Sequence, residues 1–144
     1  MEDIEAIRDL QVRNATESDK NNQAYYAQIF RPDIHIRVIH GGKVTTEFHN
    51  VQDLISNYHS FSVRTKQSFH INGQHAIDFQ DSTHATGIAY SIANVVMNNN
   101  GQDVAISNNI RYYDKYVKVD GRWWIAERDQ TFVYTTFPNL QPGK

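Results

Sequence analysis

Four long segments with the residue pattern of β-strands fill the second half of the chain, and they restrict its fold more than any other feature. The four segments cover residues 68–79, 84–97, 104–119 and 122–134. Short polar turns join them, and the last turn, Asp120-Gly121, is a strong hairpin signal because both positions accept positive φ angles. A shorter hairpin is predicted earlier, around Gly41-Gly42. The pattern therefore predicts an antiparallel meander, with a bulge at Asn72-Gly73 that bends its first strand.

The first third of the chain has a helical pattern. Apolar residues recur at helical spacing from Ile4 to Leu10, and Asn14 falls on the same stripe. A second, short helix is predicted over residues 23–30, and a third over residues 51–61 with Asn50 as its N-cap. Helices followed by a bent antiparallel sheet indicate an α+β fold with the helices on one face of the sheet.

Length and composition limit the class of protein. A chain of 144 residues can bury the core of one domain, which we place at residues 1–137, followed by a flexible tail at 138–144. The formal net charge of −2 provides no basic surface for nucleic acid. The apolar runs are too short to cross a membrane, and the acidic N-terminus does not resemble a secretion signal. Because the chain has no cysteine, we expect no disulfides, thiol nucleophiles or Cys-type zinc sites, and a cytoplasmic protein.

Three segments carry a resemblance to a known family. RYYDKYVKVDGRWWIAER (residues 111–128), DIEAIRDL (residues 3–10) and QSFHINGQ (residues 67–74) resemble corresponding parts of the SnoaL-like branch of the nuclear transport factor 2-like superfamily. Within that branch the chain is most similar to the bile-acid 7-alpha-dehydratase type, with scytalone dehydratase more distant. The resemblance implies a cone-shaped α+β barrel, in which N-terminal helices pack in a strongly bent mixed or antiparallel sheet. It does not define the function, since this superfamily contains enzymes of several kinds and proteins that only bind.

The resemblance also implies a catalytic pair, Asp19 and His70. Dehydratases of this branch place an aspartate at the end of the first helix and a histidine on the strand after the third helix. A carboxylate can orient one imidazole nitrogen and leave the other free to move a proton. Two structural interpretations remain open: Asp19 could cap the second helix or tie its turn, and His70 could be a hydrogen-bonded wall residue.

Other positions depart from the dehydratase pattern. Asn14, Ala93 and Phe132 occupy places where the branch has a tyrosine, an acid or histidine, and an arginine. A turn at residues 81–82 pairs residues whose numbers sum to about 163, so Ala93 should lie across from His70. Asn14 would either make a structural hydrogen bond or anchor a ligand oxygen.

We assign a wider set of residues to a ligand pocket. Tyr112 and Tyr113 point to opposite faces of one strand, so that one face lines the cone and the other can meet a second subunit. Arg128 is expected to form a salt bridge rather than to act as a pocket cation. The residues assigned to the pocket are Asn14, Tyr26, Ala89, Ser91, Ala93, Tyr113 and Phe132.

No metal site or cofactor is predicted. His35 and His40 are five residues apart, as are His70 and His75, and this spacing places each pair on opposite faces of a strand.

Three functional hypotheses follow. The first is a cofactor-independent lyase or isomerase, of dehydratase type, that acts on an apolar oxygenated substrate through Asp19 and His70. The second is a non-catalytic protein of the same fold that binds a small apolar or polycyclic ligand. The third, a module that binds another protein through the sheet, ranks well behind. In each case we expect a homodimer through the sheet face, and binding to neither nucleic acid nor membrane.

Overall fold

The computed structural model describes residues 2–140 and confirms the α+β class. Its elements are α1 (Asp3–Asp19), the 3-10 helix η1 (Gln23–Gln28), β1 (Phe30–His40), β2 (Lys43–Phe48), α2 (Val51–Ser62), β3 (Thr65–Phe79), β4 (His84–Asn99), β5 (Gln102–Val119) and β6 (Arg122–Thr136). The four predicted long strands are therefore present, each extended by a few residues. The predicted second helix is a 3-10 helix that ends at Gln28, because the chain already enters β1 at Phe30.

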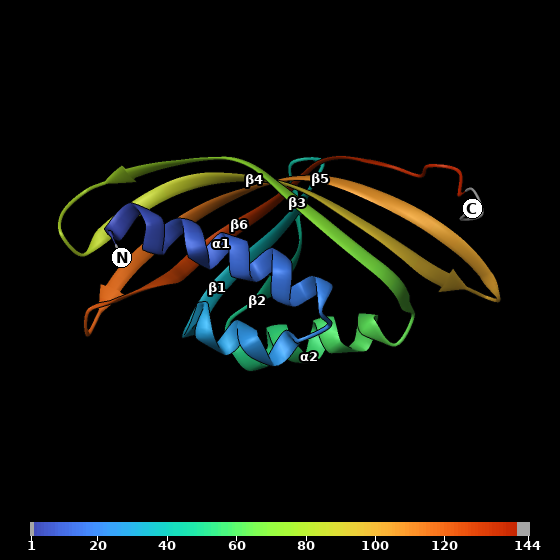
Figure 1. Cartoon of the computed structure of the whole chain (residues 1–144), viewed down its shortest axis with the longest axis horizontal. Coiled ribbons are helices and arrows are strands. Elements are labelled where there is room, and N and C mark those ends of the chain that lie inside the picture. Colours follow the sequence, from blue (N-terminus) through green and yellow to red (C-terminus); the bar gives the residue numbers. More distant parts are fainter. Residues whose placement is uncertain (1, 141–144) are drawn as a thin grey trace.

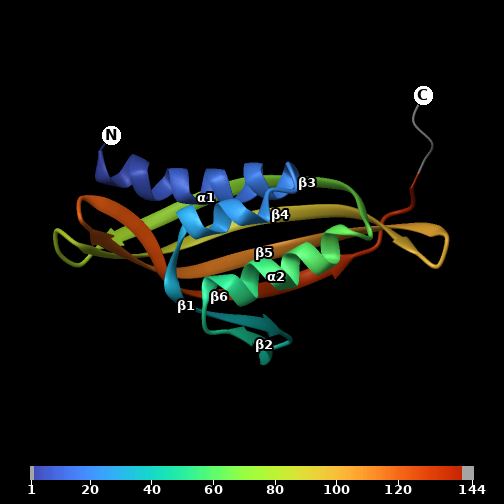
Figure 2. The ribbon, with the colours of Figure 1, turned by 90° about the horizontal axis from the view of Figure 1, so that it is seen from below.

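The strands form one six-stranded sheet in the order β2-β1-β6-β5-β4-β3. All neighbours are antiparallel except β1 and β6, which run parallel. The sheet arches over α1, η1 and α2, which lie on its concave side (Figures 1 and 2). This is the predicted cone, in the form of a mixed sheet that stays open, with β2 and β3 at its edges.

A β-bulge in β3 changes which of its side chains face the concave side. In β3 and β4 the register begins as predicted, with His70 opposite Ala93, and shifts between Asn72 and His75. His70 and His75 are both partly buried, with exposed neighbours on either side. The prediction that these two histidines lie on opposite faces is therefore wrong, because the bulge inserts one extra residue between them.

The helices are held to the sheet by apolar and polar contacts. Ile7 and Leu10 of α1 are buried in the main core, together with residues of β1, β5 and β6. At the start of α1, the carboxylate of Asp3 accepts a hydrogen bond from Trp123 Nε1 at 2.9 Å. Asn50 caps α2 as predicted, since its Oδ1 accepts the backbone N–H of Asp53 at 2.8 Å.

The described part of the predicted tail lies outside the regular elements. Of the predicted tail, residues 138–140 are exposed and belong to no helix or strand, and residues 141–144 lie outside the described residues. Within residues 2–140, no helix combines the length and the apolar character needed to span a membrane.

Candidate functional site

A cavity of about 640 Å³ lies between the helices and the concave face of the sheet. Small-molecule sites usually measure roughly 300–1,000 Å³, so this volume suits a ligand of moderate size. Much of its wall is apolar, with contributions from Phe30, Ile36, Val38, Phe48, Leu54 and Phe61. Polar side chains of α1 and β3 line another part of the wall, and they include Asp19 and His70.

The structure brings Asp19 and His70 into direct contact. Asp19 is the last residue of α1, and its Oδ1 lies 2.6 Å from Nδ1 of His70 on β3. The side chains are 27% and 15% exposed, respectively, so the pair is mostly shielded from bulk water. Within the described residues, no hydrogen bond engages Nε2 of His70. The second ring nitrogen is thus free for a ligand.

Two further hydrogen bonds fix the Asp19 carboxylate. Its Oδ2 accepts the backbone N–H of His70 at 2.9 Å, and its Oδ1 accepts the hydroxyl of Ser68 at 2.8 Å. Asp19 therefore joins the end of α1 to β3. It does not cap η1, because the N-cap position of η1 is Asn22, which makes no side-chain cap hydrogen bond. Ser68 was not among the predicted site residues, although strand alternation puts it on the same face as His70.

Asn14 and Tyr26 also lie in the cavity wall. The side chain of Asn14 is buried on α1 and makes no hydrogen bond to other residues in the described part of the chain. The Tyr26 hydroxyl lies 2.6 Å from Oγ of Ser18, and burial raises its pKa, so it stays protonated at neutral pH. The Ser18 hydroxyl donates to the backbone oxygen of Asn14 at 2.5 Å, so in its contact with Ser18 the Tyr26 hydroxyl is the donor. The side-chain amide of Asn14 can therefore donate a hydrogen bond to a ligand oxygen, whereas Tyr26 can only accept one.

Arg128 forms the expected salt bridge and also lines the cavity. Its guanidinium forms two hydrogen bonds of 2.8 Å with the carboxylate of Asp114, and it also lines the cavity. Burial by itself would lower the pKa of Arg128, but the Asp114 carboxylate outweighs this effect and raises it. Arg128 is stacked 4.0 Å from the ring centroid of Tyr112. It thus remains a fixed cation in the wall.

Three of the residues assigned to the pocket lie elsewhere. Tyr113 is 42% exposed and points to the outer face of the sheet, whereas its neighbour Tyr112 is buried and lines the cavity. Ala89 and Ser91 are buried on the concave side but do not line the cavity, because they pair with the part of β3 that α1 covers. The position of the helices decides which face of the sheet is concave and which part of that face α1 covers. Strand alternation does not predict this position.

Ala93 and Phe132 line the cavity. Ala93 lies directly across from His70 in the β3–β4 ladder. Phe132 stacks on His40 with ring centroids 4.3 Å apart, and both rings belong to the wall. Among the described lining residues, Asp19 is the single carboxylate. The wall therefore holds no second acid near His70.

One group of side chains has the composition of a metal site, although none was predicted. His35, Glu47 and His49 place their ligand atoms within 4.8 Å of one another, away from the cavity. Within residues 2–140 this is the one such group of three or more histidine and acidic residues. The histidines of the cavity, His40 and His70, do not belong to it.

Known proteins share the fold of this chain. The family model described as a SnoaL-like domain matches residues 1–129. A scytalone dehydratase-like protein from Novosphingobium aromaticivorans has a similar structure, with a TM-score of 0.81 and 20% identity over 96% of this chain and 89% of that one. The hexachlorocyclohexane dehydrochlorinase LinA type 2 has a TM-score of 0.78 and 19% identity, over 95% of this chain and 91% of that one. LinA type 3 from Novosphingobium barchaimii has a TM-score of 0.74 and 20% identity, over 95% of this chain and 93% of that one. At these identities the likeness demonstrates a shared fold.

Proposed function

This chain belongs to the SnoaL-like domain family, and from that premise we propose that it is a cofactor-independent lyase in which Asp19 and His70 form the acid–base pair. The observation that carries the proposal is the 2.6 Å contact between Asp19 Oδ1 and His70 Nδ1 in the wall of a 640 Å³ cavity. The names of two structural neighbours, scytalone dehydratase and hexachlorocyclohexane dehydrochlorinase, support an elimination reaction.

The reaction begins with Nε2 of His70 as the base. It removes a proton from a carbon next to a carbonyl group, and a carbon–carbon double bond forms as the leaving group departs with its electron pair. If the leaving group is a hydroxyl, the imidazolium returns the proton and water is released. Asp19 holds the ring in place and stabilises the imidazolium during this step.

The remaining polar wall would bind the carbonyl oxygen. The Asn14 amide can donate a hydrogen bond to it, and the guanidinium of Arg128 lines the same cavity. The apolar residues of α2 and β2 would hold the hydrocarbon part of the substrate. The substrate class is therefore a mostly apolar carbonyl compound with a leaving group β to the carbonyl.

A substrate screen combined with one variant tests the proposal. β-Hydroxycarbonyl compounds would be incubated with the protein and the products analysed by mass spectrometry. We expect His70→Ala to abolish turnover with little change in melting temperature. His40→Ala, which removes another histidine of the same wall, should retain turnover. A large loss of stability in His70→Ala would instead make His70 a structural residue.

One observation favours a second candidate, a non-catalytic binding protein. The residue across from His70 is Ala93, and the wall carries no carboxylate besides Asp19 among its described residues. In that case a ligand binds saturably, binding survives His70→Ala, and no product forms. Any turnover by the wild-type protein would eliminate this candidate.

We also propose a homodimer through the outer face of the sheet. Phe69, Ile71, Ile92 and Tyr113 lie on neighbouring strands β3, β4 and β5, and each is at least 41% exposed. An apolar patch of this kind favours contact with another protein surface. Light scattering at micromolar concentration should detect the dimer, and a single monomeric species would refute it.

A further inference from the structure

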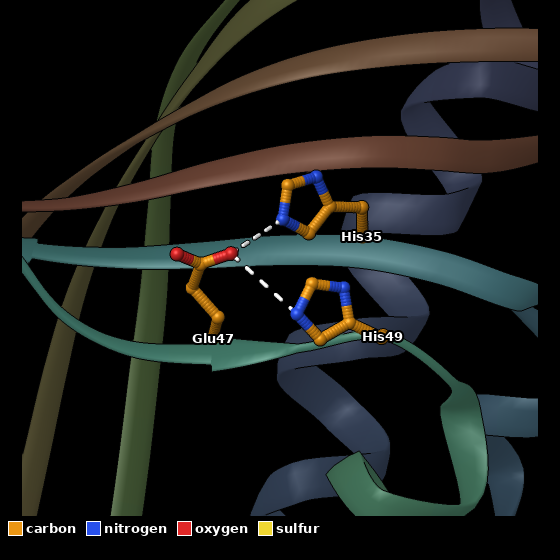
Figure 3. A group of neighbouring side chains, drawn as sticks. All are labelled: His35, Glu47 and His49. Atoms are coloured by element: carbon orange, nitrogen blue, oxygen red, sulfur yellow. Dashed lines mark hydrogen bonds and ion pairs between the residues drawn. The ribbon is translucent and has the colours of Figure 1, made fainter.

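We propose that the outer face of the β1–β2 hairpin carries a zinc-binding site formed by His35, Glu47 and His49. The three side chains converge from β1, from β2 and from the residue that follows β2 (Figure 3). This site is separate from the cavity, because residues 36, 38, 46 and 48 face the cavity while 35 and 47 face outward. It is also independent of the proposed lyase function.

The distances between the ligand atoms suit a zinc ion. Glu47 Oε2 lies 2.8 Å from His35 Nε2 and 3.6 Å from His49 Nε2, and all three atoms lie within 4.8 Å of one another. Zinc binds nitrogen and oxygen ligands at about 2.0–2.2 Å in tetrahedral geometry, which separates ligand atoms by roughly 3.3 Å. The three atoms can therefore reach this geometry by small side-chain rotations.

The donor set selects the metal. Two imidazoles and one carboxylate are a ligand combination that zinc accepts, with the remaining position left to water. Magnesium and calcium prefer sites made mainly of oxygen ligands, so two imidazoles disfavour them. Hydrogen bonding alone does not account for the group, since His49 Nε2 is 3.6 Å from the carboxylate oxygen, beyond a good hydrogen bond.

The backbone holds the three residues in place. His35 lies within β1, which pairs with both β2 and β6. Glu47 is paired with Arg37 across the hairpin, and His49 directly precedes Asn50, the N-cap of α2. The rings of His35 and His49 are stacked, with centroids 4.8 Å apart and planes 13° from parallel. A bound ion would therefore need little ordering of the chain.

Charges around the site favour a cation. Two positive groups on this side of the sheet are paired with carboxylates: Arg37 contacts Asp129 with Nε 2.8 Å from Oδ1, and Lys115 contacts Glu127 at 3.3 Å. Glu127 is also the strand partner of His35. With these pairs neutral overall, Glu47 adds one uncompensated negative charge next to the two imidazoles.

Calorimetric titration of Zn²⁺ into the full chain, without a polyhistidine tag, tests the proposal. We expect one site per chain, and an affinity at least about tenfold weaker in His49→Ala, since a lost ligand costs no less than a lost supporting residue. His49 is a suitable position because its side chain is 71% exposed, so its removal should not affect folding. Mg²⁺ should produce no comparable binding.

A matched control is His84→Ala. His84 lies 3.0 Å from Asp81 on the surface but belongs to no group of three ligands. We expect its zinc affinity to equal that of the wild-type protein. The proposal is overturned if His49→Ala binds zinc as tightly as the wild type, or if His70→Ala rather than His49→Ala abolishes binding, which would place the ion in the cavity.

Thermal unfolding provides a second readout. A ligand that binds only the folded state stabilises it by mass action, so Zn²⁺ should raise the melting temperature of the wild-type protein and of His84→Ala. His49→Ala should show no comparable rise. An equal rise in all three proteins would contradict a site at His49.

Discussion

Asp19 and His70 contact each other twice, because one carboxylate binds both the ring and the backbone of the same histidine. Oδ1 lies 2.6 Å from Nδ1, and Oδ2 accepts the backbone N–H at 2.9 Å. The backbone contact fixes the carboxylate relative to the strand, and the ring contact then fixes the imidazole. The position of the proposed base therefore depends on Asp19 at the end of α1.

The first prediction concerns the tautomer of His70. A carboxylate can only accept a hydrogen bond from neutral imidazole, so the proton should reside on Nδ1 and leave Nε2 free. Nitrogen-15 chemical shifts of the ring, measured by NMR, should report this tautomer in the wild-type protein. In Asp19→Asn the amide removes this requirement, and we expect a mixture of tautomers and a loss of turnover of about 100-fold or more. A ring protonated mainly on Nε2 in the wild-type protein would contradict the proposed role.

The second prediction concerns the buried ion pair of Asp114 and Arg128. Both side chains are almost fully buried, so removal of one partner leaves an isolated charge. We expect Asp114→Ala to lower the free energy of unfolding by about 3–5 kcal/mol, measured by urea denaturation. Glu127→Ala is the control, because its pair with Lys115 is exposed and should contribute less than about 1 kcal/mol. Equal effects of the two substitutions would show that the buried pair is not needed for stability.

The third prediction concerns Gly87 in β4. A Cβ atom there would lie 2.9 Å from the backbone oxygen of Ala76 and 2.9 Å from the ring of Tyr116. Since neither group can move freely, we expect Gly87→Ala to cost about 1–3 kcal/mol of stability. At Gly73 the nearest atom, Cβ of Tyr90, would be 3.4 Å away, so Gly73→Ala should change stability by less than about 1 kcal/mol. Chemical denaturation of both variants distinguishes the two sites.

The fourth prediction concerns pH and His75. Burial lowers the pKa of His75, whose Nε2 lies 2.8 Å from the Tyr116 hydroxyl. The charge of Asp114 acts to raise this pKa, and the charges of Arg128 and Arg8 act to lower it. The unfolded chain therefore binds this proton at a higher pH than the folded chain, near the ordinary value of about 6.5. Stability from His75 is present above that pH and is lost as the pH falls below it.

Urea denaturation at pH 7.5 and 5.5 measures this loss. We expect His75→Gln, which retains a polar group for Tyr116, to lose less stability over this interval than the wild-type protein. His84→Gln is the control, since His84 is exposed, and it should match the wild-type slope. If all three proteins lose the same stability between pH 7.5 and 5.5, His75 is not the source of the pH dependence.

Part of this structure could be predicted from local patterns. The turn after Phe79 placed His70 across from Ala93, and Asn50 was correctly identified as the start of α2. Strand alternation also separated Tyr112 from Tyr113, but it could not say which of them faces the cavity. Alternation defines two faces, whereas only the position of the helices decides which face is covered. The contact between Asp19 and His70 was anticipated through the family resemblance, since the two residues are 51 positions apart.

The sequence by itself determined the order of helices and strands, the turns, and the set of residues available for chemistry, because these depend on neighbours in the chain. The bulge predicted at Asn72-Gly73 is present, but only the tertiary structure shows how each bulge changes the faces of its strand. A bulge between Asn72 and His75 brings His75 to the face of His70, and another between Val38 and Ile39 shifts the β1–β2 hairpin. Without that second bulge, a two-residue turn at Gly41-Gly42 would place His35 opposite Phe48 instead of beside Glu47 and His49. A bulge adds one residue to one strand and reverses the alternation beyond it, and its effect on the concave face depends on how the sheet packs over the helices.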